Sequence, residues 1–368
     1  MPPLISTLSG AIGTPAAGFG FLFTLQYLAF SLCAFLGGWI KERLHLSNLH
    51  LVSAGLLLIS AVFFVGPVAL RSTAALVLWV IPLGIAGGAV ETFSSVQIAS
   101  LGGSGSSKNL CLSQVFYTIG AFLAPQMVYL ILGAGLPWES AFVLIGVFST
   151  VVLGFFLLMN LRRGAVAKER AAPVSPAPAA SSGGPLFLLM VVLMLADVLL
   201  ENLSASWLSY IFELRFALTP RDASLVLMLF WVAMMAGRLV ILLLPSRWTL
   251  WPTLLVASGA LLAATACLAA ARSLPAQLVS VGLMGVSLGP LWPVIVMTSR
   301  SVFPSERSTS TLIGVGGIGF GFGPLLGTLI LRAGWTPHFF LAHLLLGVLI
   351  CVFSVAAWRS YARRATGA

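Results

Sequence analysis

Residues 186–212 read LFLLMVVLMLADVLLENLSASWLSYIF, an apolar run with only two acidic side chains. A run of this length crosses the roughly 30 Å hydrocarbon core of a bilayer as an α-helix. Transmembrane barrels are instead built from short alternating segments, which the sequence lacks. It therefore predicts an all-α, polytopic membrane helix bundle. The predicted spans are residues 16–40, 49–70, 74–99, 110–134, 140–161, 186–212, 222–244, 249–271, 275–298, 309–331 and 337–358.

The composition excludes a water-soluble domain. Hydrophobic residues make up 59% of the 368 positions and charged residues 8%, whereas soluble domains carry roughly 25% charge. The net charge of +10 comes from basic residues scattered between apolar runs, which favours membrane orientation over nucleic-acid binding. No phosphate-binding loop or metal-ligand spacing occurs. We therefore expect no enzymatic activity, no cofactor and no metal.

Basic residues also predict the orientation of the spans, because cytoplasmic loops carry an excess of Lys and Arg. Thirteen basic residues lie on the side of the C-terminus and five on the other side, so we expect a cytoplasmic C-terminus in the plasma membrane, or in the inner membrane of a bacterium. The first set is Lys41, Arg43, Lys108, Arg162, Arg163, Lys168, Arg170, Arg247, Arg300, Arg307, Arg359, Arg363 and Arg364; the second is Arg71, Arg215, Arg221, Arg272 and Arg332.

A polar segment divides the spans into two groups. Residues 162–185 (RRGAVAKERAAPVSPAPAASSGGP) are rich in Ala, Pro, Ser and Gly, a composition typical of a flexible linker. We expect a cytoplasmic linker there, between an N-terminal half of about five spans, residues 1–161, and a C-terminal half of six spans, residues 186–368.

An internal repeat connects the two halves. GAFLAPQMVYLILGAG (120–135) aligns without gaps with GFGFGPLLGTLILRAG (319–334) at an offset of 199. Parallel repeats of a six-helix unit are one plan of secondary transporters. The offset leaves the sixth predicted span without a counterpart in the first half. We therefore expect that half to lack its opening helix, either because the start codon is misplaced, because the chain is a fragment, or because it is an eleven-helix variant.

Several motifs resemble the major facilitator superfamily and, within it, the fucose/proton symporter-like branch. They are Glu91-Thr92, the run Gln114-Val115-Phe116 with Gly120-Ala121, Glu201 six residues before Trp207, FWVAMMAGRL (230–239) and SLGPLWPVIV (287–296). The resemblance implies two six-helix halves that move a sugar-like solute together with protons. Two positions depart from the branch: Ser95 replaces an Asn, and Lys41 replaces an acid within GGWIKERLH (37–45). The acid of the family's first helix has no counterpart, and these departures put fucose itself and simple proton symport in question.

Three acids lie well inside apolar runs: Glu91, Asp197 and Glu201. A charge at mid-membrane is unfavourable by at least about 2.5–3.5 kcal/mol on insertion scales, so each is a candidate proton- or solute-binding residue. Asp197 and Glu201 are four residues apart and share one helix face, so they should resist being ionised together. The alternative is a structural role, in bonds to neighbouring helices or in an ion pair at the mouth of the site.

Other candidates are polar or aromatic. Gln114 and Tyr117 form a stripe with Thr118 that suits a hydroxyl-rich solute, or else joins helices. Trp292 lies between two prolines that should interrupt its helix and free backbone carbonyls. Arg238 lies near the cytoplasmic end of its helix, and the family resemblance favours a gate-clamping role. Gln26 and Tyr27 are weaker candidates.

The leading hypothesis is secondary active transport of a small polar, sugar-like solute by alternating access, driven by protons. We expect a monomer whose partners are the solute, protons and the lipid bilayer. One alternative is proton-coupled export of a hydrophobic drug or metabolite. Another is a membrane protein that does not transport, either a sensor or a decayed carrier.

Overall fold

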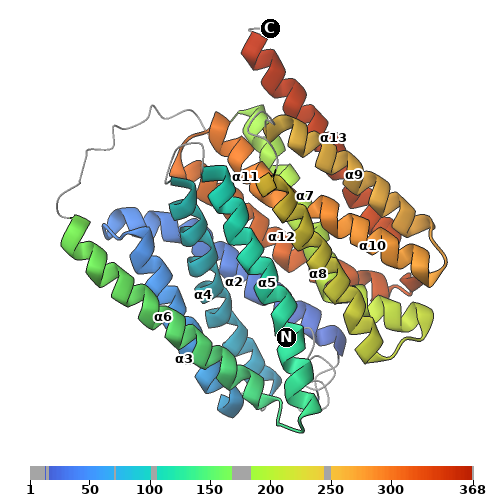
Figure 1. The fold of residues 1–368 in the computed structure, drawn as a ribbon, viewed down its shortest axis with the longest axis horizontal. Helices are drawn as coiled ribbons and strands as arrows, with labels where there is room; N and C mark the ends of the chain where they lie inside the picture. The colour runs from blue at the N-terminus through green and yellow to red at the C-terminus, as the bar shows by residue number, and fades with distance from the viewer. Residues whose placement is uncertain are drawn as a thin grey trace.

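The computed structural model describes residue 13 and residues 16–69, 72–100, 106–167, 184–243 and 250–366. Within these ranges all regular secondary structure is helical, which confirms the predicted fold class (Figure 1). The helices are α2 (Ala16–Arg43), α3 (Asn48–Ala69), α4 (Thr73–Ser100), α5 (Ser106–Gly133), α6 (Glu139–Ala167), α7 (Pro185–Phe216), α8 (Pro220–Leu243), α9 (Leu250–Ala270), α10 (Leu274–Leu288), α11 (Leu291–Val302), α12 (Glu306–Arg332), the 3-10 turn η2 (Thr336–His338) and α13 (Phe339–Thr366).

Ten segments of the described chain are long and apolar enough to cross a bilayer, and α10 and α11 together form one of them. The other predicted span is α5, whose described apolar stretch, Leu112–Ala124, is shorter. With 28 residues, α5 is about 42 Å long at 1.5 Å per residue. It packs against α4 and α8, so it belongs to the bundle.

The predicted linker lies largely outside the described residues. Helix α6 continues to Ala167, six residues beyond the predicted end of its span, and α7 begins at Pro185. Residues 168–183 are not described, so the bounds expected for the linker, residues 162–185, stay a prediction. Residues 1–15 are likewise outside the described chain, apart from Gly13.

The bundle has two groups of helices. In Figure 1, α2–α6, coloured blue to green, lie on one side, and α7–α13, coloured yellow-green to red, lie on the other. The groups meet where α12 packs against α2 and where α5 packs against α8. Two matching helix pairs across one interface are what a parallel repeat of the two halves produces.

The two helices of the internal repeat end alike. Helix α5 ends at Gly133 and α12 ends at Arg332, at the offset of the sequence repeat. Each is followed two residues later by a glycine with positive φ, 70° at Gly135 and 72° at Gly334. Glycine populates this left-handed conformation readily because it has no Cβ. The shared AG ending of the repeat is therefore a shared stop signal for the two helices.

The expected interruption occurs between α10 and α11. Helix α10 ends at Leu288 and α11 begins at Leu291. Proline has no amide hydrogen, so residues 290 and 293 cannot donate to the carbonyls four residues before them. The carbonyl of Gly289 is consequently free of its usual helical partner, and it faces the centre of the bundle, where it accepts a hydrogen bond from Arg238.

Helices α2 and α12 approach each other closely across the interface. The Thr24 hydroxyl of α2 donates to the carbonyl of Gly321 in α12 at 2.8 Å. A Cβ at Gly317 would lie 2.5 Å from the Ser31 hydroxyl and 2.8 Å from the Phe30 ring. This small-residue packing brings aromatic residues of the two halves face to face beside the central cavity.

Candidate functional site

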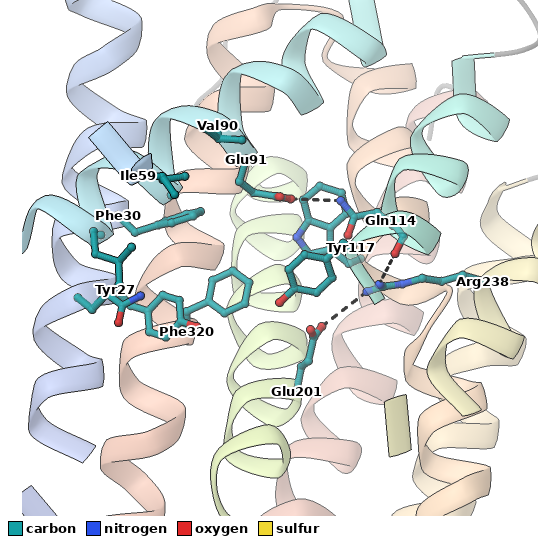
Figure 2. Close-up of a pocket in the computed structure, with 15 residues that line it drawn as sticks. Tyr27, Phe30, Ile59, Val90, Glu91, Gln114, Tyr117, Glu201, Arg238 and Phe320 are labelled. Atoms are coloured by element: carbon teal, nitrogen blue, oxygen red, sulfur yellow. Dashed lines mark hydrogen bonds and ion pairs between the residues drawn. The ribbon is translucent and has the colours of Figure 1, made fainter. Parts of the chain in front are cut away.

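A cavity of about 260 Å³ lies between the two halves (Figure 2). It receives side chains from α2, α3, α4 and α5 on one side and from α7, α8, α11 and α12 on the other. Its lining residues are Gln26, Tyr27, Phe30, Ile59, Leu83, Gly84, Gly87, Val90, Glu91, Gln114, Tyr117, Glu201, Arg238, Trp292 and Phe320.

One polar wall is formed by α4 and α5. The Gln114 side-chain amide donates from Nε2 to Oε1 of Glu91 at 3.1 Å. Gln114 is buried and Glu91 is partly buried. The bond leaves the second carboxylate oxygen of Glu91 and the amide oxygen of Gln114 without a donor among the described residues, so this wall presents hydrogen-bond acceptors to the cavity.

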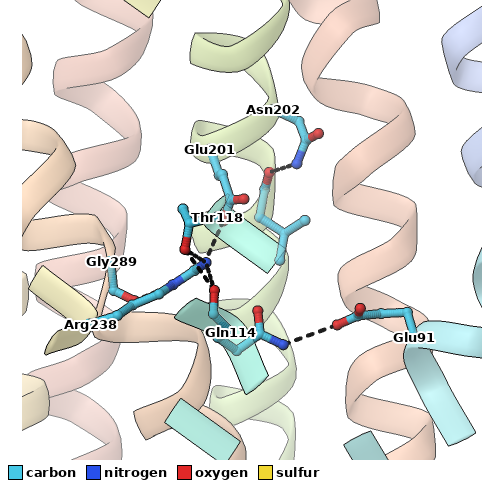
Figure 3. A network of polar contacts seen from close by, with 8 residues as sticks. Glu91, Gln114, Thr118, Glu201, Asn202, Arg238 and Gly289 are labelled. Carbon is cyan, nitrogen blue, oxygen red and sulfur yellow. Dashed lines mark hydrogen bonds and ion pairs between the residues drawn. The ribbon is translucent and has the colours of Figure 1, made fainter. Parts of the chain in front are cut away.

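Arg238 lies at the centre of a second polar group (Figure 3). Its side chain is 1% exposed. Nε donates to the carbonyl of Gly289 at 3.1 Å, and Nη1 donates to the carbonyl of Gln114 at 2.7 Å and to the Thr118 hydroxyl at 3.1 Å. Arg238 in the C-terminal half is thus tied to α5 in the N-terminal half and to the break between α10 and α11.

The remaining nitrogen of the guanidinium, Nη2, lies 4.0 Å from Oε2 of Glu201. Glu201 is almost fully buried on α7. The cavity lining therefore contains two carboxylates and a single guanidinium, and the guanidinium is paired with Glu201. Glu91 has the Gln114 amide as its hydrogen-bond partner and forms no ion pair with any residue that the structure describes.

Aromatic rings form the opposite wall. Tyr27 of α2 stacks on Phe320 of α12, with ring centroids 5.0 Å apart and planes 17° apart. Phe30 meets Phe320 edge to face at 5.7 Å. On the polar side, the Tyr117 ring lies 5.6 Å from the guanidinium carbon of Arg238. A solute in the cavity would therefore meet apolar ring faces on one side and acceptor oxygens on the other.

The structure places six of the seven predicted site residues in the cavity lining: Glu91, Gln114, Tyr117, Glu201, Trp292 and Arg238. Asp197 is the exception. It is 1% exposed and absent from the lining, so its expected role in binding a proton or the solute stays a prediction. One helical turn separates the two acids, and the cavity reaches only the second.

Sequence reasoning missed Phe30, Phe320 and Gly84, which all line the cavity. Two aromatic residues inside apolar runs give no signal of their own, because most such residues pack in a core or face lipid. Gly84 is buried against the backbone of α2, where a Cβ would collide with the carbonyl of Gln26. Gly87 has room for a side chain, since its nearest neighbour is a Phe30 ring carbon at 3.7 Å.

A two-group bundle of membrane-spanning helices around a central polar and aromatic cavity defines a polytopic membrane transporter. The model of the Major Facilitator Superfamily matches residues 1–315, and the chain belongs to that family. It is therefore a transporter of small-molecule solutes and not an enzyme. No curated protein sequence matches the chain significantly.

Solved structures with the same fold include two sugar carriers. The Escherichia coli fucose:proton symporter FucP is 17% identical, with a TM-score of 0.71 over 97% of this chain and 95% of that one. The proton:xylose symporter XylE, bound to 6-bromo-6-deoxy-D-glucose, is 12% identical, with a TM-score of 0.77 over 97% and 90%. The human organic anion transporter MFSD10 is 20% identical, with a TM-score of 0.72 over 95% and 88%. At these identities the likeness shows the fold alone.

Proposed function

We propose that this transporter moves a neutral, hydroxyl-rich, sugar-like solute together with protons, by alternating access of two halves around the central cavity. The halves are residues 1–161 and 186–368, joined by a cytoplasmic linker. The protein acts as a monomer in the plasma membrane, or in the inner membrane of a bacterium, with its C-terminus in the cytoplasm.

The state of Arg238 carries the proposal that the solute is neutral. Anion carriers need a cation with free donors, because bidentate binding of a carboxylate or phosphate uses two parallel N–H groups. In this cavity the guanidinium donates to Gly289, Gln114 and Thr118 and faces Glu201. The two carboxylates in the lining also repel a negatively charged solute. The site therefore favours a solute without negative charge.

The two walls fit the two kinds of surface on a sugar. Hydroxyl groups donate hydrogen bonds to acceptors such as the free oxygens of Glu91 and Gln114. The apolar face of a sugar ring can cover the rings of Tyr27 and Phe320. Ligand sites commonly combine a mostly apolar lining with a few placed polar groups. Two carriers of the same fold, those for fucose and xylose, are also proton symporters.

Glu91 is the proposed coupling residue. It lines the cavity, it has no ion-pair partner among the described residues, and the bond of its carboxylate is with the amide of Gln114. A carboxylate in such a site is stabilised either by a proton or by the donors of a solute. Proton binding and solute binding at one residue provide the coupling that symport requires.

Export of a hydrophobic drug or metabolite is the second candidate, and the aromatic wall supports it. Hydrophobic export and sugar transport differ in the role that each gives to Gln114. A polar solute loses affinity when the amide that fixes Glu91 is removed, whereas a hydrophobic solute bound by the rings is little affected.

Uptake into proteoliposomes tests the proposal. With acid outside, proton influx should accumulate radiolabelled L-fucose or D-xylose in vesicles of the wild type, whereas Glu91→Gln should exchange the same sugar without accumulating it. Glu139→Gln, at the start of α6, is the matched control and should behave as wild type. Accumulation by Glu91→Gln equal to wild type would refute the coupling role. Wild-type uptake of hydrophobic dyes but of neither sugar would support the second candidate.

A further inference from the structure

We infer that Asp197 is a separate proton-binding site, behind the solute cavity, which exchanges its proton with Glu201. The inference rests on the proposed function, since it assigns a second proton position to the same transport cycle. It concerns a residue that does not line the solute cavity.

The burial of Asp197 is the first observation. The side chain is 1% exposed, and neither Oδ1 nor Oδ2 has a hydrogen-bond partner among the described residues. A buried carboxylate that is ionised and unpaired is strongly unfavourable, and such a group neutralises by taking up a proton. A carboxylic acid with a proton on one oxygen is the form that this environment tolerates.

The charged neighbours of Asp197 are the second observation. Helices α8, α10, α11, α12 and α13 pack against α7. Glu201 on its own helix and Arg238 on α8 interact electrostatically with Asp197. Arg238 faces Glu201 at 4.0 Å and donates hydrogen bonds to Gly289, Gln114 and Thr118. The guanidinium is thus paired with the other acid, and Asp197 has no ion pair of its own within the described part of the chain.

The spacing of the two acids provides a route for the proton. Residues four apart on a helix are neighbours, with Cβ atoms about 5–6 Å apart, and Glu201 lines the cavity. The O–H bond of Asp197 breaks as an O–H bond forms on the Glu201 carboxylate, and the negative charge passes to Asp197. Arg238 then faces an anion at Asp197 in place of Glu201. No other reactant is needed, and Glu201 can release its proton into the cavity.

The sequence makes a direct test possible, because the chain contains only two aspartates, Asp197 and Asp222. Asp222 is exposed and accepts a hydrogen bond from Thr219. Protein made by cell-free synthesis with carbon-13 aspartate, reconstituted in nanodiscs, should show at neutral pH an infrared carboxylic-acid C=O band that shifts with the label. Asp197→Asn should abolish the labelled band and Asp222→Asn should leave it.

The same spectra test the link to Glu201. Deuterium exchange of the labelled acid should slow in Glu201→Gln, since that side chain cannot relay a proton. A wild-type sample with no label-sensitive acid band at neutral pH would overturn the inference. This measurement uses the intact wild-type protein and no solute, so it decides the matter even if Asp197→Asn folds poorly.

Transport then separates the inference from the proposed function. If the wild type accumulates neither L-fucose nor D-xylose, the proposed function fails. The infrared result still tests the protonation of Asp197 independently. If the wild type accumulates sugar, Asp197→Asn should lose accumulation under a pH gradient and keep sugar exchange. A labelled acid band together with normal accumulation in Asp197→Asn would show a structural acid and refute its part in the cycle.

Discussion

The guanidinium Nε of Arg238 donates to the carbonyl of Gly289 at 3.1 Å, and that carbonyl is available because residue 293 is proline. In a regular helix the amide of residue 293 would donate to it. This one hydrogen bond therefore depends on two residues that are far apart in the sequence, a basic residue in α8 and a proline in α11. This bond fixes the guanidinium, which in turn binds the backbone of the other half at Gln114.

Pro293→Ala should weaken the hydrogen bond from Arg238 to the Gly289 carbonyl. The new amide competes with Arg238 for the Gly289 carbonyl, and a hydrogen bond to a charged group contributes about 1.5–3 kcal/mol. We expect slower uptake with no loss of thermal stability, because alanine improves the helix. Pro290→Ala is the control, since it affects the carbonyl of residue 286, whereas Arg238 donates to Gly289, Gln114 and Thr118. Equal uptake by the two variants would contradict this account of the bond.

Arg238→Met should destabilise the protein, because Glu201 would remain buried without its counterion. Removing one partner of a buried ion pair typically destabilises by about 3–5 kcal/mol. Adding Glu201→Gln removes the uncompensated charge, so the double variant should recover a large part of the lost thermal midpoint in detergent. Independent, additive losses in the two single variants and the double variant would show that the two side chains do not interact.

Phe320→Ala should weaken solute binding without affecting proton coupling. A stacking ring contributes about 0.5–1.5 kcal/mol to binding, so we expect its loss to raise KM for the transported sugar roughly twofold to twelvefold. Phe322 lies two residues further along α12 and is 44% exposed, which makes Phe322→Ala the matched control. The ratio of accumulated to external sugar at saturation should match wild type in both variants. Unchanged KM in Phe320→Ala would exclude the aromatic wall from the solute site.

The sequence predicts the helical spans well, because charged residues are unfavourable in hydrocarbon and a long apolar run crosses the bilayer as a helix. The same argument predicts that Glu91 and Glu201 face the interior. The argument does not extend to their partners. Glu91 accepts a hydrogen bond from Gln114, and Arg238 donates one to the Gly289 carbonyl. Both bonds depend on how separate helices pack, which the periodicity within one helix does not predict.

Asp197 shows the limit of reasoning from helix periodicity. The spacing of four residues correctly puts Asp197 on the face of Glu201, but a face only gives a direction around the helix axis. Where the cavity ends along that axis is decided by the residues of neighbouring helices. Phe30 and Phe320 show the converse limit, since their contribution to the cavity comes from the close approach of α2 and α12 at small residues such as Gly317.

The central claim is that the cavity between the halves is an aqueous path open to each side of the membrane in turn. Gly87 lines the cavity and has space for a side chain, while Ile85, two residues away on α4, is 40% exposed and is not part of the lining. In a background without the four native cysteines, Gly87→Cys should react with a membrane-impermeant thiol reagent in both right-side-out and inside-out vesicles, and Ile85→Cys should not. A Gly87→Cys protein that is as unreactive as Ile85→Cys from both sides would contradict the account.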